Sequence, residues 1–256
     1  MKLTNNNYFS TEAQRFYMSV SQYKAFKRCQ AAALAEINGE YTPEKTTALI
    51  VGSYVDSCFE GTLESFKNSH PEIFKRDGNL KSDFVKAAEI IERIKRDKLF
   101  VEYMSGEKQV IMIGTIEGIP VKIKVDSLHA DKIVDLKVMK DFAPIYKAEQ
   151  GRLSFIEAWG YDIQGAVYQE IVRQNTGKRL PFYIAAATKE KTTDIGIFEV
   201  TQPYLDVALE EFRENLPYFE AVKRGVVEAE RCEECDFCKE TKELTSAVTL
   251  EELNLL

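Results

Sequence analysis

The chain has 256 residues, of which 45% are hydrophobic and 29% charged, with only 13 glycines and 7 prolines. This composition is that of an ordinary globular protein and excludes a chain that is disordered, collagen-like or coiled-coil throughout. Lys and Arg number 34 against 41 Asp and Glu, and the net charge of -7 argues against a protein that coats nucleic acid with a uniformly basic surface. An acidic balance fits a site where carboxylates surround a cation.

No apolar run approaches the roughly 20 residues that span a bilayer, and the opening MKLTNNNYFS lacks the apolar stretch of a signal peptide. We therefore expect a cytoplasmic protein with no membrane contact. Five cysteines are too few for a disulfide scaffold, and three of them crowd into CEECDFC. In a reducing compartment, cysteines spaced this closely indicate a bound metal ion or an iron–sulphur cluster.

The first part of the chain, 17–100, is predicted to be mainly helical. SQYKAFKRCQAAALAEI has helical spacing behind a Ser19 or Ser21 cap, with Cys29 in the middle of one helix. Further helices are expected over about 46–60 and 82–100, with a loop around HPEIFKRDGNLK between them.

The next part, 105–200, is predicted to hold the sheet. GEKQVIMIGTI and GIPVKIKVDSL form a hairpin at Glu117-Gly118, and DKIVDLKVM returns after a turn, which gives an antiparallel meander. FIEAWGYDIQGAVYQEIVRQNTGK is predicted to be one long helix that Gly177 ends. Strands over 181–188 and 194–200 and a helix over 203–223 follow. The cysteine tail at 228–242 comes last.

The segment from Val121 to Lys140 has the clearest chemical pattern. Side chains alternate along a strand, so Asp126 on one strand and Asp135 and Lys137 on the next converge across a short turn. Two close carboxylates repel each other unless a cation bridges them, and oxygen ligands suit Mg²⁺ or Mn²⁺. Lys137 then orients or deprotonates the attacking water, or balances charge on a phosphate. The alternative is the wet face of a half-exposed sheet, where Asp and Lys commonly alternate.

Five motifs in order carry a family resemblance: SxSQYKAFKRC, GSYVDSCFEG, EKQV, the hairpin GIPVKIKVDSLHADKIVDLK, and GYDIQGAVYQE. From about Tyr17 to Lys242, the chain resembles the PD-(D/E)XK nucleases, more narrowly their RecB-like and RecE-like branch, and phage-encoded exonucleases of the exonuclease VIII type. The resemblance implies an α/β (α+β) protein with a restriction-endonuclease-like core. We expect one domain over 1–256, with a mixed central sheet and antiparallel meander flanked by helices.

The resemblance assigns roles by position. It makes Asp126 and Asp135 metal ligands together with the Leu136 carbonyl, and it makes Lys137 the catalytic lysine. Glu107 in GEKQV matches an acidic residue that could hold a second metal, or it is simply a solvated residue at a strand end.

Two more assignments lie on helices. In GYDIQGAVY, the family uses a Gln and a Tyr to hold the edge of the active site and the DNA backbone. The resemblance therefore assigns Gln164 and Tyr168 to the active site and Tyr161, one helical turn earlier, to DNA contact. Both tyrosines could instead be aromatics at the edge of the core. The early helix departs from the family, because Asp56 stands where a metal-binding histidine is usual; a carboxylate also suits Mg²⁺ or Mn²⁺.

Cys232, Cys235 and Cys238 supply three thiolates at iron–sulphur spacing. The resemblance supplies Cys29 as the fourth ligand and implies a [4Fe–4S] cluster that joins the two ends of the chain. Zn²⁺ on the same thiolates is the main alternative, and three free surface thiols are another. Cys58 is expected to be a buried core thiol.

Lys122 and Lys124 are expected to contact DNA. The alternative is that they are ordinary solvent-exposed lysines with no role in binding. The resemblance further implies double-stranded DNA ends as substrate, a single-strand annealing recombinase as partner, and a ring-like homo-oligomer. Two other readings stay open: an iron–sulphur nuclease of CRISPR adaptation, and a non-catalytic DNA-binding protein that keeps the fold.

Overall fold

A computed structural model describes residues 1–148, 150–247 and 249–250. Its helices are α1 (Thr11–Phe16), α2 (Val20–Arg28), α3 (Gln30–Asn38), α4 (Thr47–Glu60), α5 (Leu63–Ser69), the 3₁₀ turn η1 (Pro71–Ile73), α6 (Ser82–Lys95), α7 (Lys98–Tyr103), α8 (Phe155–Ala158), α9 (Tyr161–Thr176), α10 (Gln202–Lys223) and α11 (Asp236–Glu240). Its strands are β1 (Glu107–Ile116), β2 (Ile119–Leu128), β3 (Ile133–Met139), β4 (Ile145–Lys147), β5 (Gly151–Leu153), β6 (Phe182–Thr188) and β7 (Ile195–Val200).

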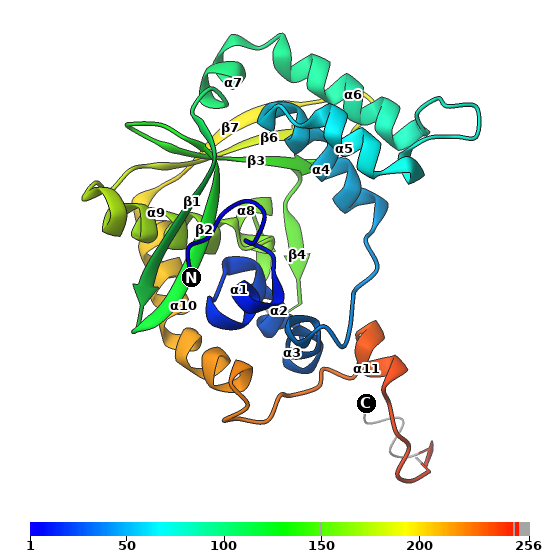
Figure 1. Cartoon of the computed structure of the whole chain (residues 1–256), viewed down its shortest axis with the longest axis vertical. Coiled ribbons are helices and arrows are strands. Elements are labelled where there is room, and N and C mark those ends of the chain that lie inside the picture. The colour runs from blue at the N-terminus through cyan, green and yellow to red at the C-terminus, as the bar shows by residue number, and fades with distance from the viewer. Residues whose placement is uncertain (149, 248, 251–256) are drawn as a thin grey trace.

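Five strands form one mixed sheet in the order β1-β2-β3-β6-β7 (Figure 1). β1 and β2 make the predicted hairpin. At its turn, Glu117 and Gly118 have φ of 49° and 72°. Two positive φ values are typical of the two-residue turn whose backbone matches the twist of the paired strands. β3 pairs with β6 in parallel and β7 returns antiparallel. The predicted fold class, a mixed sheet with an antiparallel meander, is confirmed.

Helices cover both faces of the sheet (Figure 1). On one face, α9 and α10 pack on the apolar row of β2 and on the side of β6 that carries Phe182 and Ile184. On the opposite face, α4 and α6 pack on Val134 and Leu136 of β3. This alternation along β3 is what a strand buried on both sides requires, and it places the charged residues of β3 on the α9 side.

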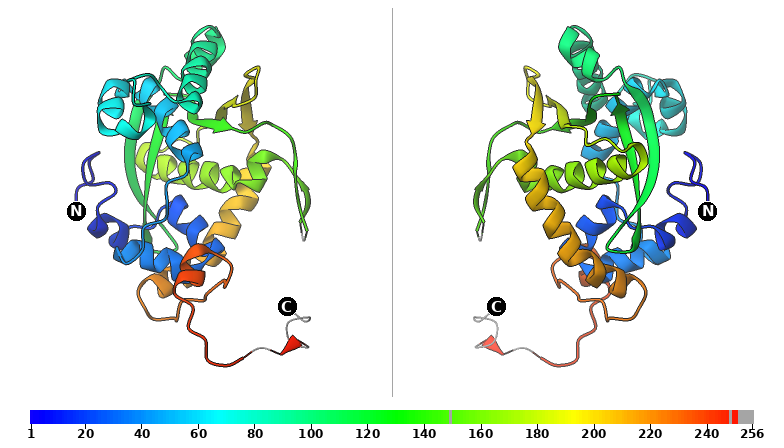
Figure 2. Two further views of the ribbon diagram at one scale, coloured as in Figure 1. Left: turned by 90° about the vertical axis from the view of Figure 1, so that its right-hand side faces the viewer. Right: turned by 90° about the vertical axis from the view of Figure 1, so that its left-hand side faces the viewer.

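The helices α2 and α3 meet the segment that follows α10 outside the sheet. α2 and α3 lie against α10, and the tail after α10 runs back until α11 contacts α3. The β4–β5 hairpin instead projects away from the body between β3 and α8 (Figure 2). Within the described residues, none of the helices combines the length and apolar character needed to cross a membrane.

The structure divides three helices that the sequence predicted as continuous. Cys29 has φ -163° and ψ 112°, so it ends α2 and begins α3 instead of lying inside one helix. Asp97 breaks the 82–100 helix by capping α7, and Gly160, with φ 62°, separates α8 from α9. Periodicity does not detect such breaks, because the apolar spacing continues on both sides of them. The short α1, α5, β4 and β5 were not predicted.

Candidate active site and cysteine cluster

The site forms where β2 and β3 part. These strands pair only at Ser127–Val134 and Leu128–Ile133, and beyond those pairs they diverge. The Asp126 carboxylate fills the gap, because its Oδ2 accepts a hydrogen bond of 3.0 Å from the backbone N–H of Leu136. Local divergence of the two strands therefore leaves a carboxylate in the space where ladder hydrogen bonds would otherwise lie.

Asp135 and Lys137 stand next to this gap on the α9 side of β3. Asp135 is only 2% exposed, and its Oδ2 pairs with the ammonium of Lys137. Its other oxygen accepts a hydrogen bond of 2.5 Å from Nε2 of Gln164 on α9. Gly165 lets α9 come this close, since a Cβ there would lie 2.4 Å from the ring of Phe182. The predicted convergence of Asp126, Asp135, Lys137 and Gln164 is what the structure contains.

Asp56 reaches the same place from the opposite face of the sheet. A small cavity, about the size that one water molecule or one metal ion needs, separates α4 from the diverging strands. We call it the acidic cavity; its polar lining residues are Asp56, Glu60, Gln109 and Asp126, and Leu136 also lines it, whereas Asp135 lies beside the gap and is not among the lining residues. The expected substitution of a carboxylate for histidine thus lies beside the other carboxylates.

The carboxyl groups of Asp56 and Asp126 in the acidic cavity have raised pKa values, so the nearby Lys137 ammonium does not fully offset their burial and mutual repulsion. Burial and the neighbouring Asp126 raise the pKa of Asp56 well above its ordinary value. Burial and the charge of Asp135 raise the pKa of Asp126 to about 7. For Lys137, burial opposes protonation, but Asp135 and Asp126 outweigh it and raise the pKa. A bound cation would remove the repulsion that keeps the two carboxyls protonated.

The donor set of the acidic cavity fits a hard divalent cation. All of its side-chain ligands are oxygens, and oxygen ligands suit Mg²⁺ and Mn²⁺. Gln109 adds a second indication: its Nε2 donates to Asp126 at 3.2 Å, while its buried Oε1 has no hydrogen-bond partner among the described residues. A buried carbonyl oxygen without a donor is costly, and a cation would satisfy it.

The structure places several predicted residues elsewhere. Glu107 is exposed at the start of β1 and does not line the acidic cavity. Lys122 was expected on a DNA-facing surface but is only 1% exposed, because the N-terminal segment covers it. Its ammonium donates a hydrogen bond of 2.5 Å to the Tyr8 carbonyl. Lys124 is half-buried and lies 5.1 Å from the ring of Phe9.

Both tyrosines of the GYDIQGAVY motif lie near the site. The Tyr161 ring centroid is 5.1 Å from the ammonium of Lys137. The Tyr168 hydroxyl donates to the Lys124 carbonyl at 3.1 Å, which ties α9 to β2. Tyr161 is therefore close to the reacting groups, whereas Tyr168 positions the strand that carries Asp126.

Sequence reasoning missed Gln109 and Glu60. Glu60 follows Asp56 by four residues on α4, a spacing that puts both on one helix face and could have identified it. Gln109 has a positive φ of 53°, which no local pattern announces, and it lies beside Asp126 through the β1–β2 pairing.

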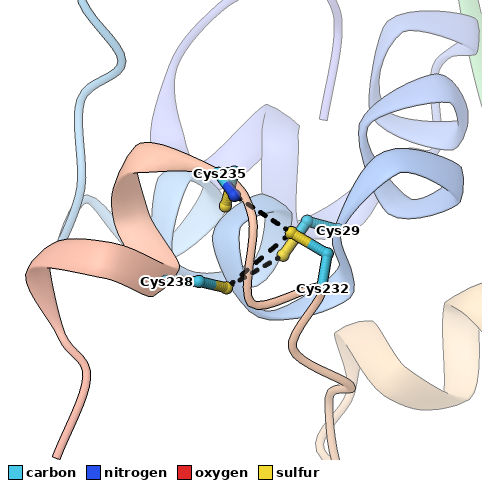
Figure 3. A group of neighbouring side chains, drawn as sticks. All are labelled: Cys29, Cys232, Cys235 and Cys238. Carbon is cyan, nitrogen blue, oxygen red and sulfur yellow. Dashed lines mark hydrogen bonds between the residues drawn. The ribbon is translucent and has the colours of Figure 1, made fainter. Parts of the chain in front are cut away.

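The second candidate centre is the thiolate cluster of Cys29, Cys232, Cys235 and Cys238. Their four Sγ atoms all lie within 4.8 Å of one another and face a common point (Figure 3). Backbone N–H groups of Glu234 and Cys235 lower the pKa of Cys232 to about 6, which favours the thiolate that metals bind. The predicted fourth partner, Cys29, is brought to the other three by the break between α2 and α3.

Comparison with known proteins gives the family. Residues 19–241 match the family described as "PDDEXK-like domain of unknown function (DUF3799)". The chain belongs to this PDDEXK-like family. It is also similar to a crystal structure from Eubacterium rectale called "Putative exonuclease", with 50% identity, a TM-score of 0.96, and coverage of 99% of this chain and 98% of that chain. No curated protein matches. Together the family and this relative support a nuclease, in agreement with the resemblance drawn from the motifs.

Proposed function

We propose that this PDDEXK-like protein is a divalent-metal-dependent deoxyribonuclease that digests linear duplex DNA from its ends. The observation that carries the proposal is the junction of Asp126, Asp135 and Lys137 at the gap between β2 and β3, with Asp56 opposite. Carboxylates around one small cavity with an ammonium beside them are the equipment of phosphodiester hydrolysis.

Asp56, Asp126, Asp135 and the Leu136 carbonyl would hold Mg²⁺ or Mn²⁺, which supplies Lewis-acid polarisation of the scissile phosphate and acidifies a water. Lys137 stays protonated, because the two carboxylates raise its pKa. As an ammonium, it would stabilise negative charge on the phosphate. Gln164 holds Asp135 in place, and Tyr161 lies over Lys137 where the backbone of DNA would pass.

Action on DNA ends is supported by the Eubacterium rectale relative, whose name, "Putative exonuclease", is that of a nuclease acting at ends. A role in recombination with a single-strand annealing partner and a homo-oligomeric assembly belong to the same proposal. The test compares linear duplex with covalently closed circular duplex in Mg²⁺, Mn²⁺ or EDTA. Release of nucleotides from the linear form alone, and only with metal, supports the proposal. Equal cutting of the circle would contradict end-dependence, and full activity in EDTA would contradict the metal site.

We also propose that the thiolate cluster holds a structural metal. Zinc–sulphur bonds of about 2.3 Å place tetrahedral thiolates about 3.8 Å apart. Cys29 and Cys238 sulphurs are 3.6 Å apart, and those of Cys232 and Cys238 are 3.9 Å apart. These separations favour Zn²⁺ over the [4Fe–4S] cluster first expected, because four iron atoms between the thiolates require wider spacing. Metal analysis with a visible spectrum of anaerobically purified protein decides: zinc without a visible band supports this assignment, and a broad iron–sulphur band overturns it.

A further inference from the structure

Trp159, the only tryptophan in the chain, lies in the break between α8 and α9 and is 56% exposed. A single exposed aromatic residue is ordinary on a protein surface, so its location decides whether it has a role. Gly160 places it: the positive φ of 62° ends one helix and starts the next, so that Trp159 faces solvent while Tyr161 reaches the active site.

The backbone around Trp159 is fixed to the catalytic groups. The ammonium of Lys24 donates to the Trp159 carbonyl at 2.8 Å and lies 5.0 Å from the Tyr161 ring centroid. That same ring is 5.1 Å from the ammonium of Lys137. The backbone of Trp159 is therefore tied, through Lys24 and Tyr161, to the part of the site that holds Lys137.

Basic residues flank Trp159 from a second element. Lys147, on the β4–β5 hairpin that projects from the body in Figure 2, donates to the Ala158 carbonyl; this hydrogen bond is 3.1 Å long. On the same hairpin, Arg152 lies opposite Tyr146, which is 74% exposed. Two lysines thus reach the backbone at Ala158 and Trp159. An exposed aromatic ring in a basic neighbourhood is the arrangement that binds unpaired nucleotides, since the cations attract phosphates and the ring stacks on a base.

We propose that Trp159 is a stacking platform for an unpaired base of the DNA near the active site. The placement follows from the chain, because Trp159 is two residues from Tyr161, whose ring lies 5.1 Å from the ammonium of Lys137. A base can present its face only when it is unpaired, so the platform takes single-stranded or frayed ends. This inference rests on the proposed nuclease function and adds a specificity-determining residue to it.

Because Trp159 is the sole tryptophan, its fluorescence reports on the platform directly. The intact protein is titrated with a short oligothymidylate in EDTA, which prevents metal-dependent cleavage, and with closed circular duplex. We expect saturable quenching by the oligothymidylate and none by the circle. Anisotropy of labelled oligothymidylate measures binding independently. Binding without quenching would overturn the inference.

Variants separate stacking from general binding. Trp159→Ala should weaken oligothymidylate binding by about 5- to 150-fold, the range that loss of one stacked base gives, while Trp159→Phe should keep most of the affinity. Tyr204→Ala is the matched control, because Tyr204 is also 56% exposed but lies at the start of α10. Equal losses for Trp159→Ala and Tyr204→Ala, or no loss for Trp159→Ala, would contradict the platform.

The two proposals fail separately. If the protein cleaves no DNA in any metal but Trp159 is quenched and Trp159→Ala loses affinity, the nuclease proposal falls and the platform stands. If cleavage is normal and Trp159→Ala binds and cuts as the wild type does, the platform falls alone.

Discussion

The acidic cavity and the thiolate cluster are two candidate metal centres built in opposite ways. The acidic cavity takes its groups from α4, β1 and the β2–β3 hairpin, all within the first 136 residues, and Asp126 and its hydrogen-bond partner Leu136 are only ten residues apart. It is enclosed between the two apolar cores on either face of the sheet. The thiolate cluster instead joins Cys29 to Cys238, 209 residues away, around a small apolar cluster that includes Ala32.

This contrast indicates a division of roles. A fold that is already rigid holds the acidic groups together, so a metal there adds chemistry more than stability. The thiolate cluster has little packing of its own, and a metal there would provide the link between α3 and the tail. Changes at one centre should therefore affect activity, and changes at the other should affect stability.

The largest effect is expected from Asp135→Ala, which removes a proposed metal ligand and leaves the Lys137 ammonium without its partner. Cleavage should fall to background and metal binding should be lost. Lys137→Ala should lower the cleavage rate by about 100- to 1000-fold while metal binding stays largely intact. Nucleotide release and calorimetric titration of Mg²⁺ measure the two properties. Asp131→Ala, an exposed aspartate on the turn before β3, is the control that should change neither.

Normal cleavage by Lys137→Ala would remove the lysine from the proposed mechanism. Loss of activity in Asp131→Ala equal to that in Asp135→Ala would mean that the hairpin tolerates no change, and the comparison would then say nothing about ligands.

A second large effect is expected from Cys238→Ser in the thiolate cluster. Cys238 is fully buried, and its loss should release the metal and lower the melting temperature by about 5 °C or more. Mg²⁺ affinity measured below the melting transition should remain unchanged. Cys58→Ser is the control, since Cys58 lies outside the cluster. If Cys238→Ser melts as the wild type does but fails to bind Mg²⁺, the division of roles is wrong.

Two glycines give a smaller and opposite pair of effects. Gly165→Ala should destabilise the fold by about 1–3 kcal/mol, because the new Cβ would lie 2.4 Å from Phe182, and cleavage should fall as α9 shifts Gln164 away from Asp135. Gly52→Ala on α4, where no atom lies within 4 Å of the new Cβ, should stabilise by about 0.5–1 kcal/mol. Denaturant unfolding of both variants measures these changes, and destabilisation by Gly52→Ala would contradict the packing described.

The same contrast explains what sequence could predict. Alternation along β2 and β3 predicted that Asp126, Asp135 and Lys137 converge on one face of the hairpin. The structure brings them together differently: the apolar row of β2 faces α9, as Asp135 and Lys137 do, so Asp126 lies on the α4 side and meets them at the gap where the strands part. The alternation did not predict that the strands part. The helix break at Cys29 was also not predicted, because no Gly or Pro marks it. The break brings Cys29 to Cys238, which is 209 residues away, and a local pattern contains no information about that contact.

Smallest in size, and specific to the acidic cavity, is a dependence of metal binding on pH. The pKa of Asp126 is raised to about 7, so below that pH the folded protein holds a proton that a cation must displace. In the absence of metal, this group's contribution to stability declines as pH rises from the unfolded pKa toward about 7, because the folded carboxyl is the better proton acceptor over that range. Mg²⁺ should therefore raise the melting temperature more at about pH 8 than at about pH 6. Asp126→Asn should abolish the pH dependence along with much of the shift, whereas Cys238→Ser should retain it. A metal-induced shift that is flat over this range would mean that Asp126 is already ionised before the cation binds.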